Sequence, residues 1–518
     1  MKKIKIILLF IVLSVIGISL IYKNKDSKMS AKNNLAIMVK NESGEYVSSN
    51  SIPTGDYVLN EDKTFCENGG KVKSYDSSTG QIGFSFLGSD RCSLYFDIVL
   101  DEENPTITNL SVSGTTVTLT LSDNNELSSY GISTSNTVEP TSWTSISGSS
   151  YNLNTSITTK GIYYIWVKDS VGNKSVSEAI DLETKGWETI LLNNSAGATT
   201  VDSAKTYIEG KTTSTTPDFS TTATTNEGMY VATDDLGTSY YFRGAVDNNW
   251  IKFGKDSSGN DIYWRIIRIN GDGSIRMIYS GTTAPTSSTA VVMTDDGTQI
   301  GKSNYNSNFS NPSYVGYMYK TSVQHGLDTS STIKTTIDNW YATTTLETDA
   351  TTKSLVADQI FCNDRTASTS STGTPGEISG SMSDRTTYYF GSPFRYNNPI
   401  LTCPSESDKF TVNESNGNGK LTYPVGLITF DEAIMAGGDG HGESANTSYY
   451  LYTSLYYWLG SPYSSNLTFG AMVGAIYSYG NMSNNKVTGS YGVRPVISLS
   501  AKAKLSGSGT YNDVYTVS

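Results

Sequence analysis

The stretch YYWLGSPYSSNLTFGAMVGAIYSYGNMSNNKVTGSYGVRPVISL covers residues 456–499 and alternates apolar or aromatic runs with turn residues. Such punctuation predicts short antiparallel strands joined by tight connections. The expected strands are Tyr456–Leu459, Leu467–Val473, Ala475–Tyr479 and Val493–Leu499. A Ser461-Pro462 turn, Gly474 and an Asn-rich tip at Asn481, Asn484 and Asn485 are expected to separate them. The stretch therefore predicts a β-meander that decides the fold of the last part of the chain.

Two motifs frame a larger unit around this meander. Trp264-Arg265-Ile266 and Gly492-Val-Arg-Pro495 resemble the opening and closing motifs of an uncharacterised bacterial domain, over roughly 240–500. The late strands are also similar to the C-type-lectin-like fold, which includes formylglycine-generating sulfatase-modifying enzymes and bacterial surface proteins. The resemblance implies a C-terminal α+β head with two helices beside a twisted sheet. It carries over no oxidase chemistry, because that chemistry uses a late Cys and no Cys follows Cys403.

Local signals predict where the two helices of this head lie. Ile333, Ile337, Trp340 and Tyr341 are spaced to share one helical face, with Ser330 or Ser331 as the cap. Thr429 and Glu432 have the spacing of a capping box, and Gly437-Gly438 is a stop signal.

A chain of 518 residues is too long for one ordinary domain. Val117, Leu119 and Leu121 alternate with Thr, which predicts a strand with one buried face. Lys168-Asp-Ser-Val-Gly-Asn173 resembles a turn of bacterial Ig-like repeats. We therefore expect a multidomain, β-rich chain. Its expected parts are a signal-anchor or transmembrane segment (1–28), a small β module (29–101), an Ig-like β-sandwich (102–184), a Ser/Thr-rich linker (185–227) and the C-type-lectin-like α+β domain (228–518).

The N-terminus and the cysteines indicate the compartment. Lys2, Lys3 and Lys5 precede an apolar run at Ile6–Tyr22, which predicts an uncleaved signal-anchor, with a cleaved signal peptide as the alternative. The four Cys form two local pairs, Cys66 with Cys92 and Cys362 with Cys403, which predict two disulfides; four free thiols are the alternative. The expected location is the cell membrane, single-pass with the bulk extracellular, or secreted if the segment is cleaved.

Charge and composition argue against several classes of function. The net charge is −12 with no basic block outside the N-terminus, so a nucleic-acid partner is not expected. The two His, His325 and His441, sit in Gly-containing loops, and two imidazoles cannot build a metal site of several His. No catalytic motif is found, and Asp431 and Glu432 are adjacent on a helix rather than paired across a cleft. We expect no cofactor, no metal and no enzymatic activity.

The loops at Tyr463–Asn466 and Tyr477–Asn485 are the candidate binding regions, since Tyr, Ser, Asn and Gly supply adaptable contact area. Arg494 is either a recognition residue for an acidic ligand or half of an internal pair with a carboxylate such as Glu432. The candidate ligand-binding residues are Tyr463, Asn466, Tyr477, Tyr479, Asn481 and Arg494. The predicted function is an adhesion or binding protein for an extracellular protein or glycan. The alternatives are an enzyme acting on cell-wall or host glycans and a purely structural surface component.

Overall fold

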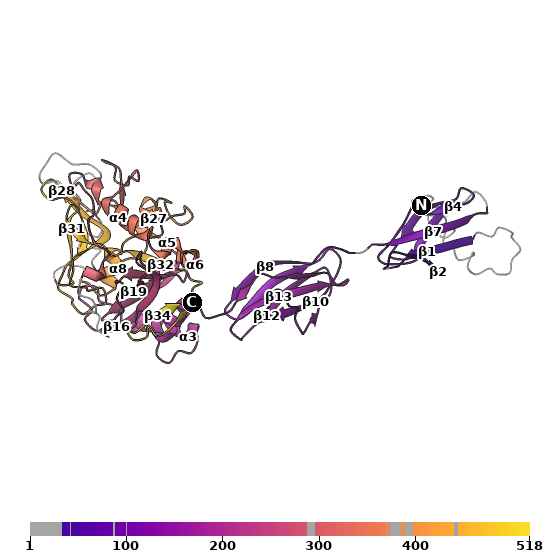
Figure 1. Ribbon diagram of the computed structural model, residues 1–518, viewed down its shortest axis with the longest axis horizontal. Coiled ribbons are helices and arrows are strands. Elements are labelled where there is room, and N and C mark those ends of the chain that lie inside the picture. Colours follow the sequence, from indigo (N-terminus) through magenta and orange to yellow (C-terminus); the bar gives the residue numbers. More distant parts are fainter. Residues whose placement is uncertain are drawn as a thin grey trace, which may run out of the picture. The chain divides into compact units, whose positions relative to one another are not determined.

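The computed structural model describes residues 34–41, 43–85, 89–99, 101–286, 296–369, 371–372, 385–388, 397–439 and 444–518. The expected membrane segment at 1–28 and His441 lie outside the described residues. Within the described ranges, no helix is long and apolar enough to cross a membrane. The chain is β-rich and divides into two compact units, residues 1–182 and 183–518 (Figure 1).

The first unit begins with a small all-β module that is closed by a disulfide. Its main sheet has the order β2-β1-β7-β3, with β4 also pairing with β7, and a separate hairpin is formed by β5 and β6. The strands are β1 (Asn34–Lys40), β2 (Tyr46–Ser49), β3 (Tyr57–Leu59), β4 (Phe65–Cys66), β5 (Lys71–Asp76), β6 (Gln81–Ser85) and β7 (Arg91–Ile98). The buried core is Ile82, Cys92, Leu94 and Phe96, and Cys66 is bonded to Cys92 as the sequence predicts.

Two sheets enclose the second core of this unit. One sheet has the order β12-β9-β8, and the other has the order β11-β10-β13-β14 with β15 beside β13. Val117, Leu119 and Leu121 are buried on alternate positions of β9, which confirms the predicted one-sided strand. The strands are β8 (Thr106–Ser113), β9 (Thr116–Ser122), β10 (Leu127–Ser133), β11 (Thr144–Ser145), β12 (Ser150–Ser156), β13 (Ile162–Asp169), β14 (Lys174–Val176) and β15 (Ile180–Asp181).

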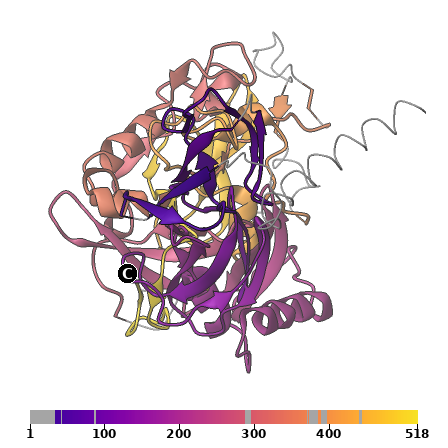
Figure 2. The same ribbon diagram turned by 90° about the vertical axis from the view of Figure 1, so that its right-hand side faces the viewer.

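The stretch 185–227 differs from the extended linker that its composition predicts. It holds α2 (Gly186–Asn193) and α3 (Val201–Ser214). The longer helix, α3, is labelled in Figure 1 and is seen as a coiled magenta ribbon in Figure 2. Ile190, Leu191, Ala204 and Ile208 are fully buried in the core of the second unit. The prediction is wrong because the few apolar residues here are spaced to fall on one face of each helix. That face is covered by the core of the second unit, so the helices need little apolar surface of their own.

The second unit contains the head, built on two sheets that share one core. The larger, nine-stranded sheet has the order β24-β32-β20-β19-β18-β34-β33, and β17 joins β16 to β19. Asn270–Gly273 connects β19 to β20, as its turn composition predicts. The strands are β16 (Asn226–Asp234), β17 (Gly237–Gly244), β18 (Trp250–Lys255), β19 (Asp261–Ile269), β20 (Ile275–Tyr279), β24 (Val356–Ala357), β32 (Val496–Leu499), β33 (Leu505–Ser506) and β34 (Tyr515–Val517).

The smaller sheet has the order β21-β31-β28-β29-β30, with β26 also pairing with β28. Its strands are β21 (Lys302–Asn304), β26 (Arg385–Thr387), β28 (Tyr457–Asn466), β29 (Gly470–Ile476), β30 (Met482–Lys486) and β31 (Ser490–Gly492). Two short hairpins stand apart from both sheets: β22 (Met318–Tyr319) with β23 (Thr329–Ser330), and β25 (Phe361–Cys362) with β27 (Lys409–Phe410). Cys362 is bonded to Cys403, which confirms the second predicted pair.

Both predicted helices of the head are present. Ser331 caps α4 (Thr332–Tyr341), and its hydroxyl accepts from the Lys334 N–H. Thr429 and Glu432 form a capping box at α8 (Phe430–Met435), as their spacing predicts. The other helices among the described residues are α5 (Thr345–Thr348), α6 (Ala350–Ser354) and the single 3-10 turns η1 (Asp296–Thr298), η2 (Pro312–Val315) and η4 (Glu406–Asp408).

The late meander exists but its boundaries differ from the expectation. Ser461 and Pro462 lie inside β28 rather than in a turn, and Asn484 and Asn485 lie inside β30 rather than at a loop tip. Register shifts flank Pro462, where a residue without an N–H interrupts the regular ladder of hydrogen bonds. Composition therefore predicted the strands of this region better than its turns.

Candidate functional site

The β28–β29 hairpin separates the predicted binding residues into two groups. Asn466 is at the end of β28, and its side-chain oxygen accepts from the N–H groups of Thr468 and Phe469 at 3.0 and 2.7 Å, so it shapes the hairpin turn. Tyr477 follows β29 at the opposite end of the hairpin. A ten-residue strand spans roughly 30 Å. Tyr463 and Asn466 are therefore not part of one site with Tyr477, Tyr479 and Asn481.

Four tyrosines gather at the Tyr477 end and are named here the tyrosine surface: Tyr456, Tyr477, Tyr479 and Tyr491. The ring centroid of Tyr456 lies 4.9 Å from that of Tyr477 and 5.3 Å from that of Tyr491. Tyr491 in turn packs on buried Trp458 at 4.8 Å. Tyr479 belongs to the turn that follows Tyr477. The surface is thus an aromatic layer with a buried tryptophan beneath it.

Sequence reasoning missed Tyr456 and Tyr491 as members of this site. Both are of the same residue type as the predicted members, but Tyr456 falls in a predicted strand and Tyr491 in the connection before the last predicted strand, outside both candidate loops. The useful signal was the i, i+2 spacing of Tyr456 and Trp458, which places both on one face of a strand. Tyr491 is brought beside them by β31, whose Gly492 pairs in parallel with Tyr457. That pairing joins residues 35 positions apart, which a local pattern does not reveal.

The hydroxyl groups of the two half-buried members of the tyrosine surface are engaged within the protein. Tyr456 is 39% exposed and Tyr479 is 67% exposed, while Tyr477 and Tyr491 are half-buried. The Tyr477 hydroxyl donates to the Asn484 carbonyl at 2.9 Å, and the Asn485 side-chain amide donates to the Tyr491 hydroxyl. Burial and the neighbouring Tyr477 raise the pKa of Tyr491 above its ordinary value, so this ring stays neutral. A ligand would therefore meet apolar ring area bordered by Asn and Ser groups.

The turn that carries Tyr479 is held by backbone contacts. The Asn446 N–H donates to the Tyr479 carbonyl at 3.1 Å, and the Tyr449 hydroxyl donates to the Gly480 carbonyl at 3.2 Å. Gly480 has a φ of 75°, and a Cβ there would lie 1.9 Å from the Asn446 carbonyl oxygen. Only glycine fits this position. The most exposed ring of the tyrosine surface is therefore displayed from a fixed backbone.

Arg494 lies in the core, away from this surface. It is 1% exposed, and its guanidinium donates to the carbonyls of Tyr279 and Leu451, both at 3.0 Å. Burial lowers the pKa of Arg494. Among the described residues it makes no ion pair, so the expected pair with Glu432 is wrong. Arg494 does not pair with Glu432 because Glu432, which lies on α8, pairs with Arg268 and Arg276 instead.

Glu432 pairs with Arg268 at 3.1 Å and with Arg276 at 2.5 Å. Arg268 also pairs with Asp234 at 2.6 Å, and all four side chains are almost fully buried. These groups line a cavity of about 40 Å³, together with Asp235, Asp364, Gln359 and Asp431. Organic ligands usually occupy roughly 300–1,000 Å³, so this cavity does not admit a sugar ring.

The carboxylates of this cavity are also occupied by protein groups. Asp235 accepts from the Cys403 N–H at 2.9 Å and pairs with Lys409 at 3.1 Å. Asp431 accepts from the Ile400 N–H at 3.0 Å. The cavity is thus lined by a structural charge network and offers no open pair of carboxylates for glycoside hydrolysis.

His325 has a different environment from the solvated turn that its sequence context predicts. Its Nδ1 lies 2.9 Å from Asp408, which is fully buried and also holds Arg365 through a 2.8 Å hydrogen bond. The partly exposed imidazole of His325 thus contacts the buried ion pair of Asp408 and Arg365. No local sequence pattern predicts this contact, because the three residues are far apart along the chain.

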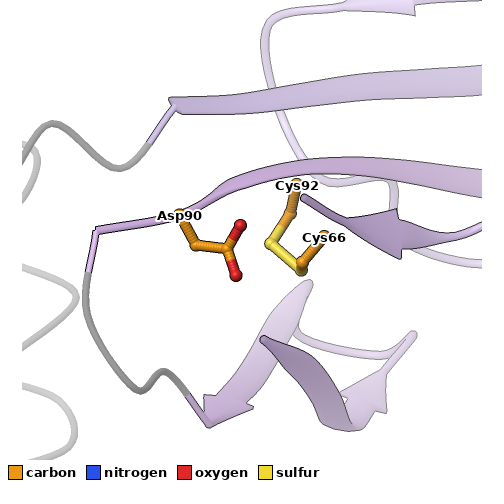
Figure 3. A group of neighbouring side chains, drawn as sticks. All are labelled: Cys66, Asp90 and Cys92. Atoms are coloured by element: carbon orange, nitrogen blue, oxygen red, sulfur yellow. A yellow bond between two sulfur atoms is a disulfide. The ribbon is translucent and has the colours of Figure 1, made fainter. Parts of the chain in front are cut away.

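Figure 3 shows a group in the first module that combines a carboxylate with two sulfurs: Cys66, Asp90 and Cys92. The sulfurs are bonded to each other and so are not thiolate ligands for a metal. Asp90 accepts from the N–H groups of Asn68 and Gly70 at 2.8 and 2.7 Å. Burial raises the pKa of Asp90, but these backbone N–H groups outweigh it and hold the pKa below its ordinary value. Asp90 thus holds the loop at Asn68 and Gly70 next to the Cys66–Cys92 disulfide.

No protein-family model and no curated protein matches this chain. The tyrosine surface is therefore the candidate site on its geometry alone.

Proposed function

We propose that this chain is a membrane-anchored extracellular binding protein of a bacterial surface. A C-type-lectin-like head would be carried on the small β module and an Ig-like sandwich. Its ligand would be an extracellular protein or a glycan, bound at the tyrosine surface. The observation that carries this proposal is a layer of three packed tyrosine rings, Tyr456, Tyr477 and Tyr491, next to a fixed turn that exposes a fourth ring, Tyr479.

The chemistry of the tyrosine surface supports binding rather than catalysis. Tyrosine offers large apolar area with little conformational entropy to lose, and it is enriched where proteins bind other molecules. Because the Gly480 turn already holds Tyr479 in place, a ligand meets a surface that needs little ordering. Asn484 and Asn485 border the rings and supply polar groups at the rim.

The arrangement of the second unit supports the C-type-lectin-like assignment. Two sheets share one core, α4 and α8 accompany them, and the chain ends in a late antiparallel meander. The motif arginines Arg265 and Arg494 both lie in the core of this unit. Two facing sheets around one core, with no disulfide among residues 106–182, support an Ig-like assignment for the sandwich. Two disulfides support an oxidising compartment.

The proposal is tested by screening the full-length chain against a glycan array and, separately, in pull-downs with extracellular proteins. Tyr456→Ala and Tyr479→Ala are expected to reduce binding at least tenfold, since central aromatic contacts contribute about 2 kcal/mol or more. Tyr207→Ala is the matched control, because Tyr207 lies on α3 and its exposure of 43% is close to the 39% of Tyr456. Retention of every detected interaction by both test variants would refute the assignment of the site.

A further inference from the structure

A groove of about 610 Å³ crosses the small β module between two strand edges. β3 and β4 form one wall and β5 forms the other, and this space is named here the edge groove. Its volume lies within the roughly 300–1,000 Å³ that is usual for ligand sites. Tyr57, Leu59, Val72 and Tyr75 line the groove, and all four are half-buried side chains that pack on the core of the module. That core is therefore open on the side of the groove.

Both walls of the edge groove carry strand edges that have no neighbouring strand. β3 and β4 pair with β7, and β5 pairs with β6. Among the described strands, none covers the outer edge of β3, β4 or β5. An uncovered edge presents a row of backbone donors and acceptors that a further strand can use. The edge groove therefore offers backbone groups as well as apolar side chains.

The register of β3 against β7 shows which backbone groups face the edge groove. The Asn60 N–H, directly after β3, donates to the Tyr95 carbonyl at 2.8 Å. Bonded and non-bonded positions alternate along an antiparallel pair, so Val58 also bonds to β7, whereas Leu59 between them does not. The N–H and C=O of Leu59 are therefore turned away from β7, toward the groove that Leu59 lines.

The apolar side chains of the edge groove have the spacing that a strand can use. Val58 is 48% exposed and Phe65 is 54% exposed, and both line the groove. Successive side chains of a strand point to opposite faces, so a strand laid beside β3 would turn every second side chain toward Val72 and Tyr75. The groove thus suits an extended peptide with apolar residues at alternate positions.

The rim of the edge groove is basic, although the whole chain has a net charge of −12. Lys71 and Lys73 on β5 are exposed, and within the described ranges neither takes part in an ion pair. Glu61 is the one acidic residue among the described lining. Two lysines against one glutamate favour a partner that carries acidic residues. The same charges disfavour the chain's own residues 23–32, which contain four lysines and one aspartate.

We propose that the edge groove binds an extended acidic peptide segment of a partner protein, which adds a strand to the edge of β3. Backbone hydrogen bonds to Leu59 supply affinity, and the apolar and basic walls select the side chains. Because a register shift at Lys73 interrupts β5, the regular edge of β3 takes the added strand. A glycan or a lipid has no row of amide groups to match a strand edge. This site lies in the first unit and does not depend on the tyrosine surface.

The first test uses a fluorescent heptapeptide, acetyl-Glu-Val-Thr-Val-Thr-Val-Glu-amide, titrated with the full-length chain. Fluorescence anisotropy is expected to show saturable binding at one site per chain. The same peptide with N-methylated amides cannot donate to a strand edge, so it is expected to bind roughly tenfold more weakly or less. Equal binding of the two peptides would overturn strand addition, and a lack of saturable binding by the unmodified peptide would overturn the groove as a peptide site.

The second test exchanges the charges of the rim. The double variant Lys71→Glu, Lys73→Glu is expected to bind the heptapeptide roughly tenfold more weakly and to prefer an analogue with Lys at both ends, because the attraction becomes repulsion. Lys160→Glu with Lys502→Glu is the matched control, since both lysines are exposed and lie outside the groove, and it is expected to bind like the wild type. An unchanged preference for Glu-ended peptide in the rim variant would overturn the acidic partner.

Two measurements on the wild-type chain complete the test and need no variant to fold. Hydrogen exchange at the Leu59 amide is expected to slow roughly tenfold when the heptapeptide is bound, because this N–H then has an acceptor. Binding that leaves Leu59 exchange unchanged would overturn addition to the β3 edge. Sedimentation is expected to show no dimer that the heptapeptide dissociates. Such a dimer would overturn the choice of a partner protein, since a second copy of this chain would then occupy the groove.

Discussion

At the scale of single residues, the head places its arginines in the core and gives them different partners. Arg268 and Arg276 share the carboxylate of Glu432, whereas among the described residues Arg494 donates to carbonyl oxygens and packs on the ring of Tyr457. Burial lowers the pKa of Arg265 to about 9. A buried ion pair is easily damaged by removing one partner, because the other charge is left uncompensated. A single change at Glu432 is therefore expected to destabilise the head strongly.

Glu432→Gln is expected to destabilise the head by about 3–5 kcal/mol, because two buried guanidinium groups lose their shared carboxylate. Unfolding in guanidinium chloride measures the loss. Glu347→Gln is the matched control, since Glu347 pairs with Lys353 near the surface and its loss should cost about 1 kcal/mol or less. Equal losses in the two variants would contradict the role given to Glu432.

The same residue predicts a dependence on pH. Burial raises the pKa of Glu432, but Arg276 and Arg268 outweigh burial and hold the pKa below its ordinary value. A carboxyl with a lowered folded pKa stabilises the fold above its unfolded pKa of about 4.3, and this stabilisation is lost as pH falls through the folded value. Thermal unfolding at pH 7 and at pH 3–4 should show a steeper loss in the wild type than in Glu432→Gln. Parallel losses would assign the acid sensitivity to other carboxyls.

At the scale of elements, the difference between local and distant signals decides what the sequence could predict. Capping residues at Ser331 and Thr429 located α4 and α8, because a cap acts within one turn of the helix it starts. Within 185–227 the sequence allows a short helical turn at Val201–Gly210, but it predicts neither α2 nor the full length of α3, because the stability of these helices comes from a core supplied by distant residues. The tyrosine surface was found in part: Tyr477 and Tyr479 follow from loop composition, whereas Tyr491 depends on the pairing of β31 with β28.

Within the candidate site, the turn after β29 is expected to tolerate substitution least. Gly480→Ala places a Cβ against the Asn446 carbonyl and forces a positive φ on alanine, so the turn must move and Tyr479 must move with it. Ligand binding by the full-length chain is expected to fall at least tenfold. Gly259→Ala is the matched control, with a φ of 84° and no atom within 4 Å of the added Cβ. A loss of binding in both variants would point to general strain rather than to the Gly480 turn.

At the scale of the whole molecule, the two units have cores of very different size. Among its described residues, the small β module buries four apolar residues in its own core, whereas a single cluster of several dozen buried residues runs through the second unit. A small domain with a small core usually depends on cross-links. The two disulfides therefore have unequal importance even though both close loops of similar length.

Reduction of the full-length chain is expected to unfold the small β module while the head stays folded. Loss of Cys66–Cys92 removes about 3–4 kcal/mol of loop-closure stabilisation, which is comparable to the whole stability of so small a core. Loss of Cys362–Cys403 costs a similar amount, but the head has more burial to offset it. Hydrogen exchange of residues 34–98 and 226–506, with and without reductant, measures this. Loss of protection in the head first would contradict the ranking of the two cores.

The helices α2 and α3 also limit how far the head can travel from the sandwich. A free coil of roughly 40 residues would have an average end-to-end distance of roughly 35 Å, whereas the chain left between β15 and α2 is residues 182–185, at most about 14 Å when fully extended. A short connecting segment would raise the effective concentration of the head near any target that is held close to the sandwich of the same molecule. If the head binds receptors as proposed, the short connection would keep one molecule from bridging widely spaced ones. Avidity on a crowded surface would then have to come from the density of molecules rather than from the reach of each one.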